Sequence, residues 1–172
     1  MLQRGELNSW VLGWDIELLC DKVYNLSLIC FIMNILFVCK ANVGRSQMAS
    51  AFFNKLSKKN KSTSAGTQVG EKEGQKIGDN EKTKLLIKVM NEEGIDLRNF
   101  KRNQLTPQMV DKADRVVVMA EKSECPEYLL KTNKVIFWKI EDVNGRYDSY
   151  EYHIKTRDDI KKLVEKLVKE IG

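Results

Sequence analysis

The stretch Met33-Asn-Ile-Leu-Phe-Val-Cys39-Lys-Ala-Asn-Val-Gly-Arg45-Ser46 decides how the rest of the chain is interpreted. Its apolar run, 35–38, is typical of a short strand buried on both faces. A polar loop over 39–44 follows. Apolar residues then recur at helical spacing and predict a helix over 45–58. A strand that passes through a short loop into a helix is the first unit of a parallel α/β sheet.

The alternation of strand and helix patterns continues to the C-terminus. We therefore expect one flavodoxin-like α/β domain, a three-layer sandwich in which a four-stranded parallel sheet carries helices on both faces. Ligands of such sheets bind at the carboxyl ends of the strands, so the loop at 39–44 is the first place to look for chemistry. The further predicted strands are 62–65, 115–119 and 134–138, and the further predicted helices are 81–93, 106–113 and a last one that ends at 171.

Two helix starts carry sequence signals. Thr106-Pro107 combines an N-cap residue with proline at the first helical position. Thr156 with Asp159 resembles a capping box, which places the start of the last helix at Thr156.

The amino-acid composition limits the classes of function that the chain can have. The chain has 172 residues and a formal net charge of +5, which suits one compact domain with an anionic substrate but gives no sign of a nucleic-acid groove. The single histidine, His153, excludes a metal site built from several imidazoles. The four cysteines include no Cys-x-x-Cys pair, and reduced thiols in the cytoplasm are expected. We expect no metal, no organic cofactor, and neither a nucleic-acid nor a membrane partner.

Residues 1–32 differ from the rest of the chain. They hold two basic and four acidic residues, a net charge of −2, which leaves +7 for the remainder. Their apolar residues form neither a signal peptide nor a run of about 20 residues that could span a membrane. We expect Met33 to be the working start, residues 1–32 to be an upstream translation or non-essential extension, and 33–172 to be the domain. The alternative is an amphipathic helix that packs on the domain or on a membrane surface.

The loop after the first strand has the properties of an oxyanion site. Successive backbone N–H groups in such a turn, with the N-terminus of the following helix, bind a tetrahedral oxyanion. Arg45 can add two parallel hydrogen bonds to it. The same positive field favours the thiolate form of Cys39, which makes it a nucleophile, and Ser46 can donate a hydrogen bond to the sulfur.

The pattern Val38-Cys39-x-x-Asn42-x-x-Arg45-Ser46 resembles the phosphate loop of low-molecular-weight protein tyrosine phosphatases and of the related thioredoxin-coupled arsenate reductases. The resemblance covers about 33–172 and includes Ser64-Ala65-Gly66-Thr67. It implies that Cys39, Arg45 and Ser46 are catalytic and that Asn42 buttresses the loop. The residues that it implies for substrate binding are Lys40, Ala41, Asn42, Val43 and Gly44.

Two loop positions depart from the family pattern. Ala41 stands where glycine is common, and Gly44 stands where many members have a second cysteine. Cys39 therefore cannot form the in-loop disulfide that some of these phosphatases use.

The resemblance also implies a general acid after the fourth strand, where the family has an Asp-Pro pair. Glu141-Asp142-Val143 stands at that place. Asp142 is the expected acid, with Val143 in place of the proline, and Glu141 is the fallback. Such an acid protonates the leaving oxygen and later activates water.

The expected function is hydrolysis of a phosphomonoester through a cysteinyl phosphate, on a phosphorylated protein or a small phosphomonoester. Phosphotyrosyl protein is the substrate that the resemblance implies. Apolar Val43 suits an aromatic ring, and Trp138, Tyr147 and Tyr150 are candidates to stack on it or to serve only in packing.

Two alternatives stay open. The run 45–49 is closer to the reductase branch, and Cys125 lies where reductases carry their last redox cysteine, so the chain could reduce arsenate with Cys39, Cys125 and thioredoxin as partner. Against this, Met119-Ala120 fills the place of their other thiol. The third hypothesis is a non-catalytic regulator that binds an oxyanion.

Overall fold

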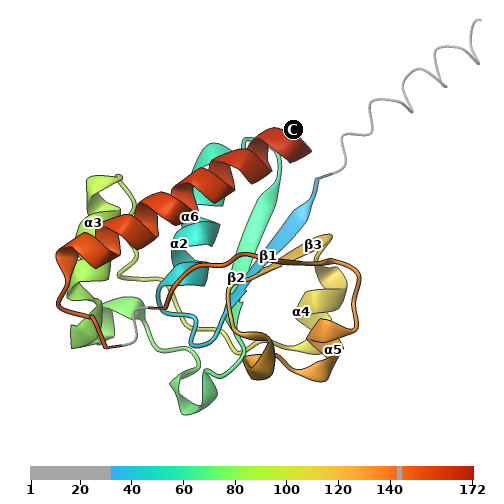
Figure 1. Ribbon diagram of the computed structural model, residues 1–172, viewed down its shortest axis with the longest axis horizontal. Helices are drawn as coiled ribbons and strands as arrows, with labels where there is room; N and C mark the ends of the chain where they lie inside the picture. The colour runs from blue at the N-terminus through green and yellow to red at the C-terminus, as the bar shows by residue number, and fades with distance from the viewer. Residues whose placement is uncertain (1–31, 143–144) are drawn as a thin grey trace, which may run out of the picture. The chain divides into compact units, whose positions relative to one another are not determined.

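The computed structural model describes residues 32–142 and 145–172, and residues 32–172 form one compact unit (Figure 1). The expectations for residues 1–31 and for Val143 lie outside the described residues. The unit is built on a four-stranded, wholly parallel sheet of order β2-β1-β3-β4. Its strands are β1 (Asn34–Cys39), β2 (Lys61–Gly66), β3 (Arg115–Val118) and β4 (Val135–Phe137).

Helices cover both faces of this sheet (Figure 1). This confirms the flavodoxin-like three-layer arrangement. No helix in the described ranges is long and apolar enough to cross a membrane. One face carries α2 (Arg45–Leu56), α3 (Lys84–Glu92) and α6 (Tyr150–Ile171), and the other carries α4 (Pro107–Lys112) and α5 (Glu127–Leu130). Short 3-10 turns occupy Gly70–Lys72, Ile77–Asp79, Glu81–Thr83 and Lys122–Glu124.

The central strand β1 divides the core into two layers. Its side chains alternate between the faces, as strand geometry requires. Phe37 packs under α2 against Phe53 and Trp138, with ring centroids 5.9 and 5.7 Å away. Leu36 and Val38 point to the opposite face, under α4 and α5. Both faces of β1 are therefore buried away from water, which explains its unbroken apolar run.

The last helix starts earlier than its sequence signal suggested. It begins at Tyr150 with Ser149 as N-cap, whose Oγ accepts a hydrogen bond from the N–H of Tyr152. The prediction that Thr156 caps this helix is therefore wrong. Thr156 is buried in the second turn, because Tyr152 and His153 extend the inward-facing stripe toward the N-terminus.

Other boundaries differ by a turn or less. Helix α2 ends at Leu56 rather than 58, and the predicted helix at 81–93 opens as a 3-10 turn before α3. The four-residue helix α5 was not predicted, since so short an element has no periodicity to detect. The Thr106-Pro107 start is confirmed: Thr106 Oγ1 accepts from the N–H of Met109.

The sheet order fixes where a ligand can bind. β2 lies on one side of β1 in the sheet, and β3 lies on its other side. The connection after β1 and the connection after β2 therefore run in opposite directions, and they diverge at the carboxyl end of β1. A crevice opens at such a switch point. The loop at residues 40–44 lies at this crevice, beside the end of β3.

Gly66 allows β2 to approach this loop closely. It pairs in register with Cys39. A Cβ added at Gly66 would lie 2.8 Å from both the Asn42 nitrogen and the Lys40 oxygen. Because both are backbone atoms, they could give way only if the loop moved.

We expect Gly66→Ala to lower the free energy of unfolding by about 2 kcal/mol through overpacking. The displaced loop should also bind inorganic phosphate more weakly. Urea denaturation with and without phosphate measures both effects. Thr63→Ala, an exposed change on the same strand, is the control and should stay within about 0.5 kcal/mol. Equal midpoints for the two variants would contradict the close approach.

Candidate active site

The loop between β1 and α2 leaves a row of backbone donors without partners. In the described part of the chain, no N–H group of residues 40–44 donates a hydrogen bond to another group of the protein. The N-terminus of α2, which begins at Arg45, has no side-chain cap within the described residues. Free N–H groups in a turn, together with the positive end of a helix, form an anion-binding nest.

Asn42 holds the loop in this shape through hydrogen bonds on its buried side. It has a positive φ of 50°, and its side chain is fully buried. Its Nδ2 donates to Ser46 Oγ at 2.9 Å and Ser64 Oγ at 3.0 Å. Its Oδ1 accepts from the Asn103 N–H at 2.7 Å and from Gln47 Nε2 at 3.1 Å. The side chain of Asn42 therefore braces the loop and does not line the substrate cavity.

Cys39, at the end of β1, faces the hydroxyl of Ser46. The distance from Cys39 Sγ to Ser46 Oγ is 3.0 Å. Because the Ser46 oxygen already accepts from Asn42, its own hydrogen is available to the sulfur. This geometry suits Ser46 for stabilising a thiolate at Cys39.

Arg45 is a buried cation at the start of α2. Its Nη1 donates to the carbonyl oxygens of Met119 at 2.5 Å and Ile140 at 3.2 Å. Its Nη2 lies 2.8 Å from Asp142 Oδ2. These bonds connect the start of α2 to the ends of β3 and of the segment after β4. An oxyanion on the loop would therefore find a guanidinium already held in place.

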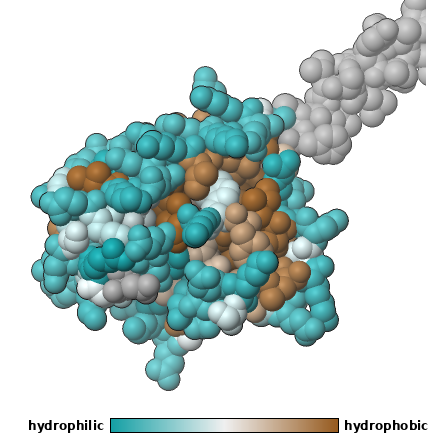
Figure 2. Space-filling model, in the orientation of Figure 1, coloured by the Kyte–Doolittle hydropathy of each residue, from teal (hydrophilic) through white to brown (hydrophobic). Residues whose placement is uncertain are grey.

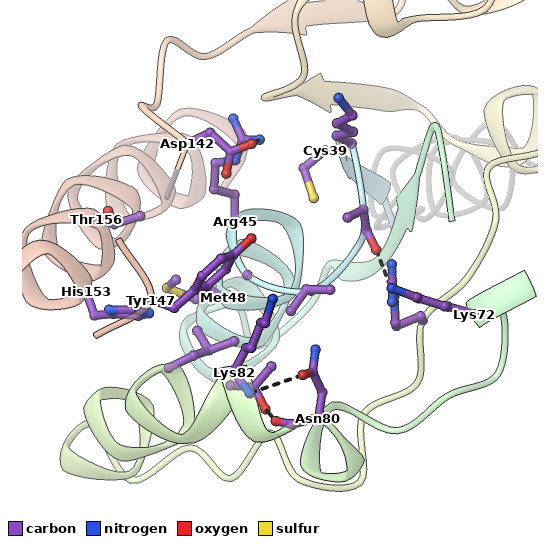
Figure 3. A pocket seen from close by; sticks show the side chains of 17 residues that line it. Cys39, Arg45, Met48, Lys72, Asn80, Lys82, Asp142, Tyr147, His153 and Thr156 are labelled. Atoms are coloured by element: carbon purple, nitrogen blue, oxygen red, sulfur yellow. Dashed lines mark hydrogen bonds and ion pairs between the residues drawn. The ribbon is translucent and has the colours of Figure 1, made fainter. Parts of the chain in front are cut away.

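The expected acid, Asp142, lies on the same cavity as the cysteine. Figure 3 shows its carboxylate over the Arg45 guanidinium, on the side of the cavity opposite Lys72. The backbone oxygen of Asp142 accepts from the Tyr152 hydroxyl at 2.8 Å. The fallback acid, Glu141, instead pairs with Arg146 and does not line the Cys39 cavity.

A cavity of about 390 Å³ opens above the loop (Figure 3). Four of the five loop residues expected to bind substrate line it, all except Asn42. Of the three aromatic candidates, only Tyr147 lines it. Trp138 packs on Phe37 in the core, and Tyr150 donates to Glu92 on α3. His153 lines it too, with Nδ1 2.7 Å from the Ser149 oxygen.

Several residues of the site were missed by sequence reasoning. Lys72, Lys82 and Arg102 line the cavity, and Gln47 and Asn103 brace Asn42. Lys72 and Lys82 lie in 3-10 turns and Arg102 in an irregular segment, and a local pattern does not show which side chains there face a cavity. Only tertiary contacts reveal their role.

A scan against protein-family models finds a match that covers the whole described domain from β1 onward. Residues 34–172 match the family model described as low molecular weight phosphotyrosine protein phosphatase. The chain belongs to this family. The search of curated protein sequences found no match to the chain.

Solved structures of this phosphatase family and its superfamily share the fold. The chain is similar to the low molecular weight protein tyrosine phosphatase from T. tengcongensis, at 27% identity and a TM-score of 0.66, over 80% of this chain and 99% of that one. It is similar to the YwlE arginine phosphatase from Geobacillus stearothermophilus, at 25% identity and a TM-score of 0.66, over 80% and 92%. An arsenate reductase in the phosphate-binding state shares 26% identity at a TM-score of 0.65, over 82% and 100%.

Cys125, the candidate redox thiol, lies in a different environment from Cys39. It packs against the core layer under α4 and α5, whereas Cys39 belongs to the layer under α2. Its Sγ lies 3.3 Å from the Glu121 oxygen. Burial, together with the charges of Glu124 and Glu121, raises the pKa of the Cys125 thiol. A raised pKa reduces the thiolate available for attack on an adduct at Cys39.

Removing the Asn42 side chain should collapse the nest. Asn42→Ala removes four hydrogen bonds, three of them to the buried side chains of Ser46, Gln47 and Ser64, and places alanine at positive φ. We therefore expect a loss of about 3 kcal/mol in the free energy of unfolding. Phosphate binding, measured by calorimetry, should fall with it.

Asn54→Ala is the matched control. The Asn54 amide also bonds the backbone, at Ser62, but it is exposed and remote from the loop. Its loss should be at most about 1 kcal/mol, with phosphate affinity kept. An Asn42→Ala protein that still binds phosphate like the native chain would contradict the bracing role.

Proposed function

We propose that this protein is a cysteine-dependent phosphomonoester hydrolase that acts on phosphotyrosyl side chains through a cysteinyl-phosphate intermediate. The observation that carries the proposal is the convergence on one cavity of Cys39, the free amides of residues 40–44, Arg45 and Asp142. This is a nucleophile, an oxyanion site and an acid in one place, which is what phosphoryl transfer to a thiol requires.

The first step transfers the phosphoryl group to sulfur. The loop amides and Arg45 hold the three equatorial oxygens, and Cys39 Sγ attacks phosphorus in line. The S–P bond forms as the bond to the tyrosyl oxygen breaks, and that oxygen takes the proton of Asp142.

The second step returns the enzyme to its starting state. Asp142, now a carboxylate, takes a proton from water, and the water oxygen attacks phosphorus. The S–P bond breaks and its electron pair stays on Cys39, where the Ser46 hydroxyl stabilises the thiolate. Inorganic phosphate then leaves the loop.

The cavity walls support an aromatic substrate. Apolar side chains of Val43, Met48 and Leu86 line it beside the ring of Tyr147. Tyr147 is 41% exposed, so its ring is accessible to a ligand. A tyrosyl ring could pack between these groups while its phosphate lies on the loop.

Arsenate reduction is the second candidate, favoured by the solved reductase at 26% identity. Two features of Cys125 argue against it: the raised pKa and the packing in the opposite core layer. We therefore place it after the phosphatase. An oxyanion-binding regulator is the third, and it would bind phosphate without turnover.

Cysteine variants separate the three functions. Hydrolysis of p-nitrophenyl phosphate by the full chain, with reductant present, should fall on the order of 10⁴-fold or more in Cys39→Ser, because the nucleophile is lost. Cys125→Ser is the matched control and should keep native turnover. Arsenate reduction with thioredoxin that needs Cys125, with no phosphatase turnover, would establish the reductase instead. Phosphate binding with neither activity would leave the regulator.

Asp142 and Glu141 can be distinguished by the leaving group. Asp142→Asn should lower kcat about 10²–10⁴-fold on phenyl phosphate, whose phenolate leaves poorly without a proton. The loss on p-nitrophenyl phosphate should be smaller, because that leaving group needs little protonation. Glu141→Gln, the control, should lose little on either substrate. The reverse pattern would make Glu141 the acid.

A further inference from the structure

More cationic side chains line the cavity than are needed to bind one phosphoryl group. Five cationic side chains but only one carboxylate line it among the described residues. Two of the cations already have acidic partners: Arg45 pairs with Asp142, and Lys40 lies 2.8 Å from Glu124. The remaining three are Lys72, Lys82 and Arg102.

These three cations have no acidic partner among the residues that the structure describes. Within the described ranges, no carboxylate oxygen lies within 4.0 Å of a side-chain nitrogen of Lys72, Lys82 or Arg102. Lys82 Nζ instead lies 5.3 Å from the ring centroid of Tyr147. The Lys82 ammonium therefore stands at the aromatic wall of the cavity, where a substrate ring would pack.

Arg102 gives the strongest indication of an anion-binding role among the three cations, because its side chain is only 5% exposed. Its Nε donates to the Ala41 carbonyl at 3.0 Å and its Nη1 to Gln75 Oε1 at 3.4 Å, both neutral acceptors. Burial lowers the pKa of Arg102, and the charge of Cys39 acts in the opposite direction. A buried charge paired only with neutral groups is costly, and an anion in the cavity would offset that cost.

The unpaired cations lie away from the acid. Figure 3 places Lys72 and Lys82 on the opposite side of the cavity from Asp142. In the proposed mechanism, the phosphoryl group binds to the loop amides and to Arg45. A second anionic group on the same substrate would therefore meet Lys72, Lys82 and Arg102.

We propose that Lys72, Lys82 and Arg102 form a second anion subsite, and that the preferred substrates are phosphotyrosyl segments with a further acidic group next to the phosphorylated residue. The inference rests on the proposed phosphatase function. The acidic group can be a flanking carboxylate or a second phosphate, because both present oxygens to ammonium and guanidinium donors.

Three peptides test the subsite on the full chain. They are identical except that the phosphotyrosine is flanked by glutamate, glutamine or phosphoserine. At low salt, kcat/KM should be about tenfold higher for the glutamate peptide than for the glutamine peptide, as expected for two or three partly exposed ion pairs. At about 0.5 M salt the ratio should fall toward one. A larger ratio for the phosphoserine peptide would identify phosphate as the preferred second group.

The double variant Lys72→Met, Lys82→Met keeps the apolar stems and removes two charges. Its ratio of kcat/KM for the glutamate and glutamine peptides should drop below about twofold. Arg102 is left in place because it also holds the Ala41 carbonyl. Lys58→Met, Lys59→Met is the matched control outside the cavity and should keep the native ratio. Equal kcat/KM for all three peptides, or a native ratio in the cavity variant, would overturn the subsite.

Measurements of peptide binding, made without turnover, distinguish failure of the subsite proposal from failure of the proposed phosphatase function. The same peptides are titrated into Cys39→Ser protein by calorimetry, with and without the two lysine changes. A preference for the acidic peptides that the lysine changes abolish supports the subsite even if the native chain turns over no phosphomonoester. Equal affinities for all three peptides would overturn the subsite, whether or not the native chain is active.

Discussion

The hydrogen bonds of the Asn42 side-chain amide hold the proposed active site in shape. Its two donors and its acceptor oxygen bond to the helix start, to β2 and to the segment that carries Asn103. These bonds satisfy the buried amide and keep the residue at positive φ. The backbone N–H groups of 40–44 are then left for a ligand rather than used inside the protein. An anion site of this kind needs no metal ion, because backbone dipoles and one guanidinium supply the positive field.

The sheet topology determines which groups can reach that field. Divergence of the chain at the carboxyl end of β1 opens the crevice, and Gly66 lets β2 lie directly against the loop. Arg45 then connects α2 to the carbonyl oxygens at the ends of β3 and of the segment after β4. The proposed nucleophile, Cys39, and the proposed acid, Asp142, are far apart in the sequence. They share one cavity because Cys39 ends β1 and Asp142 follows β4, and these parallel strands end at the same edge of the sheet.

Charge is distributed unevenly around the cavity. The proposed acid, Asp142, lies beside Arg45. The cations for which the described residues offer no acidic partner lie on the walls formed by the 3-10 turns and by Arg102. A phosphoryl dianion at the loop therefore meets one carboxylate on one side and an excess of positive charge on the other. Such asymmetry orients a charged substrate as well as binding it.

Local sequence determined the chemistry of the loop. Cys39 and Arg45 belong to one strand–loop–helix unit, and the apolar run before them and the helical spacing after them are short-range patterns. The sheet class followed from the same alternation. The resemblance located Asp142, although its pairing with Arg45 is a tertiary contact.

Only the tertiary structure decided the rest. Thr156 has the residue type of a cap but lies inside α6, because burial of Tyr152 and His153 outweighs a local signal worth about 1 kcal/mol. Arg102 lies in an irregular segment and Lys82 in the 3-10 turn Glu81–Thr83. The local sequence gives no sign that either side chain lies at the cavity. Their positions depend on contacts between residues far apart in the chain, and these contacts form only when the domain packs.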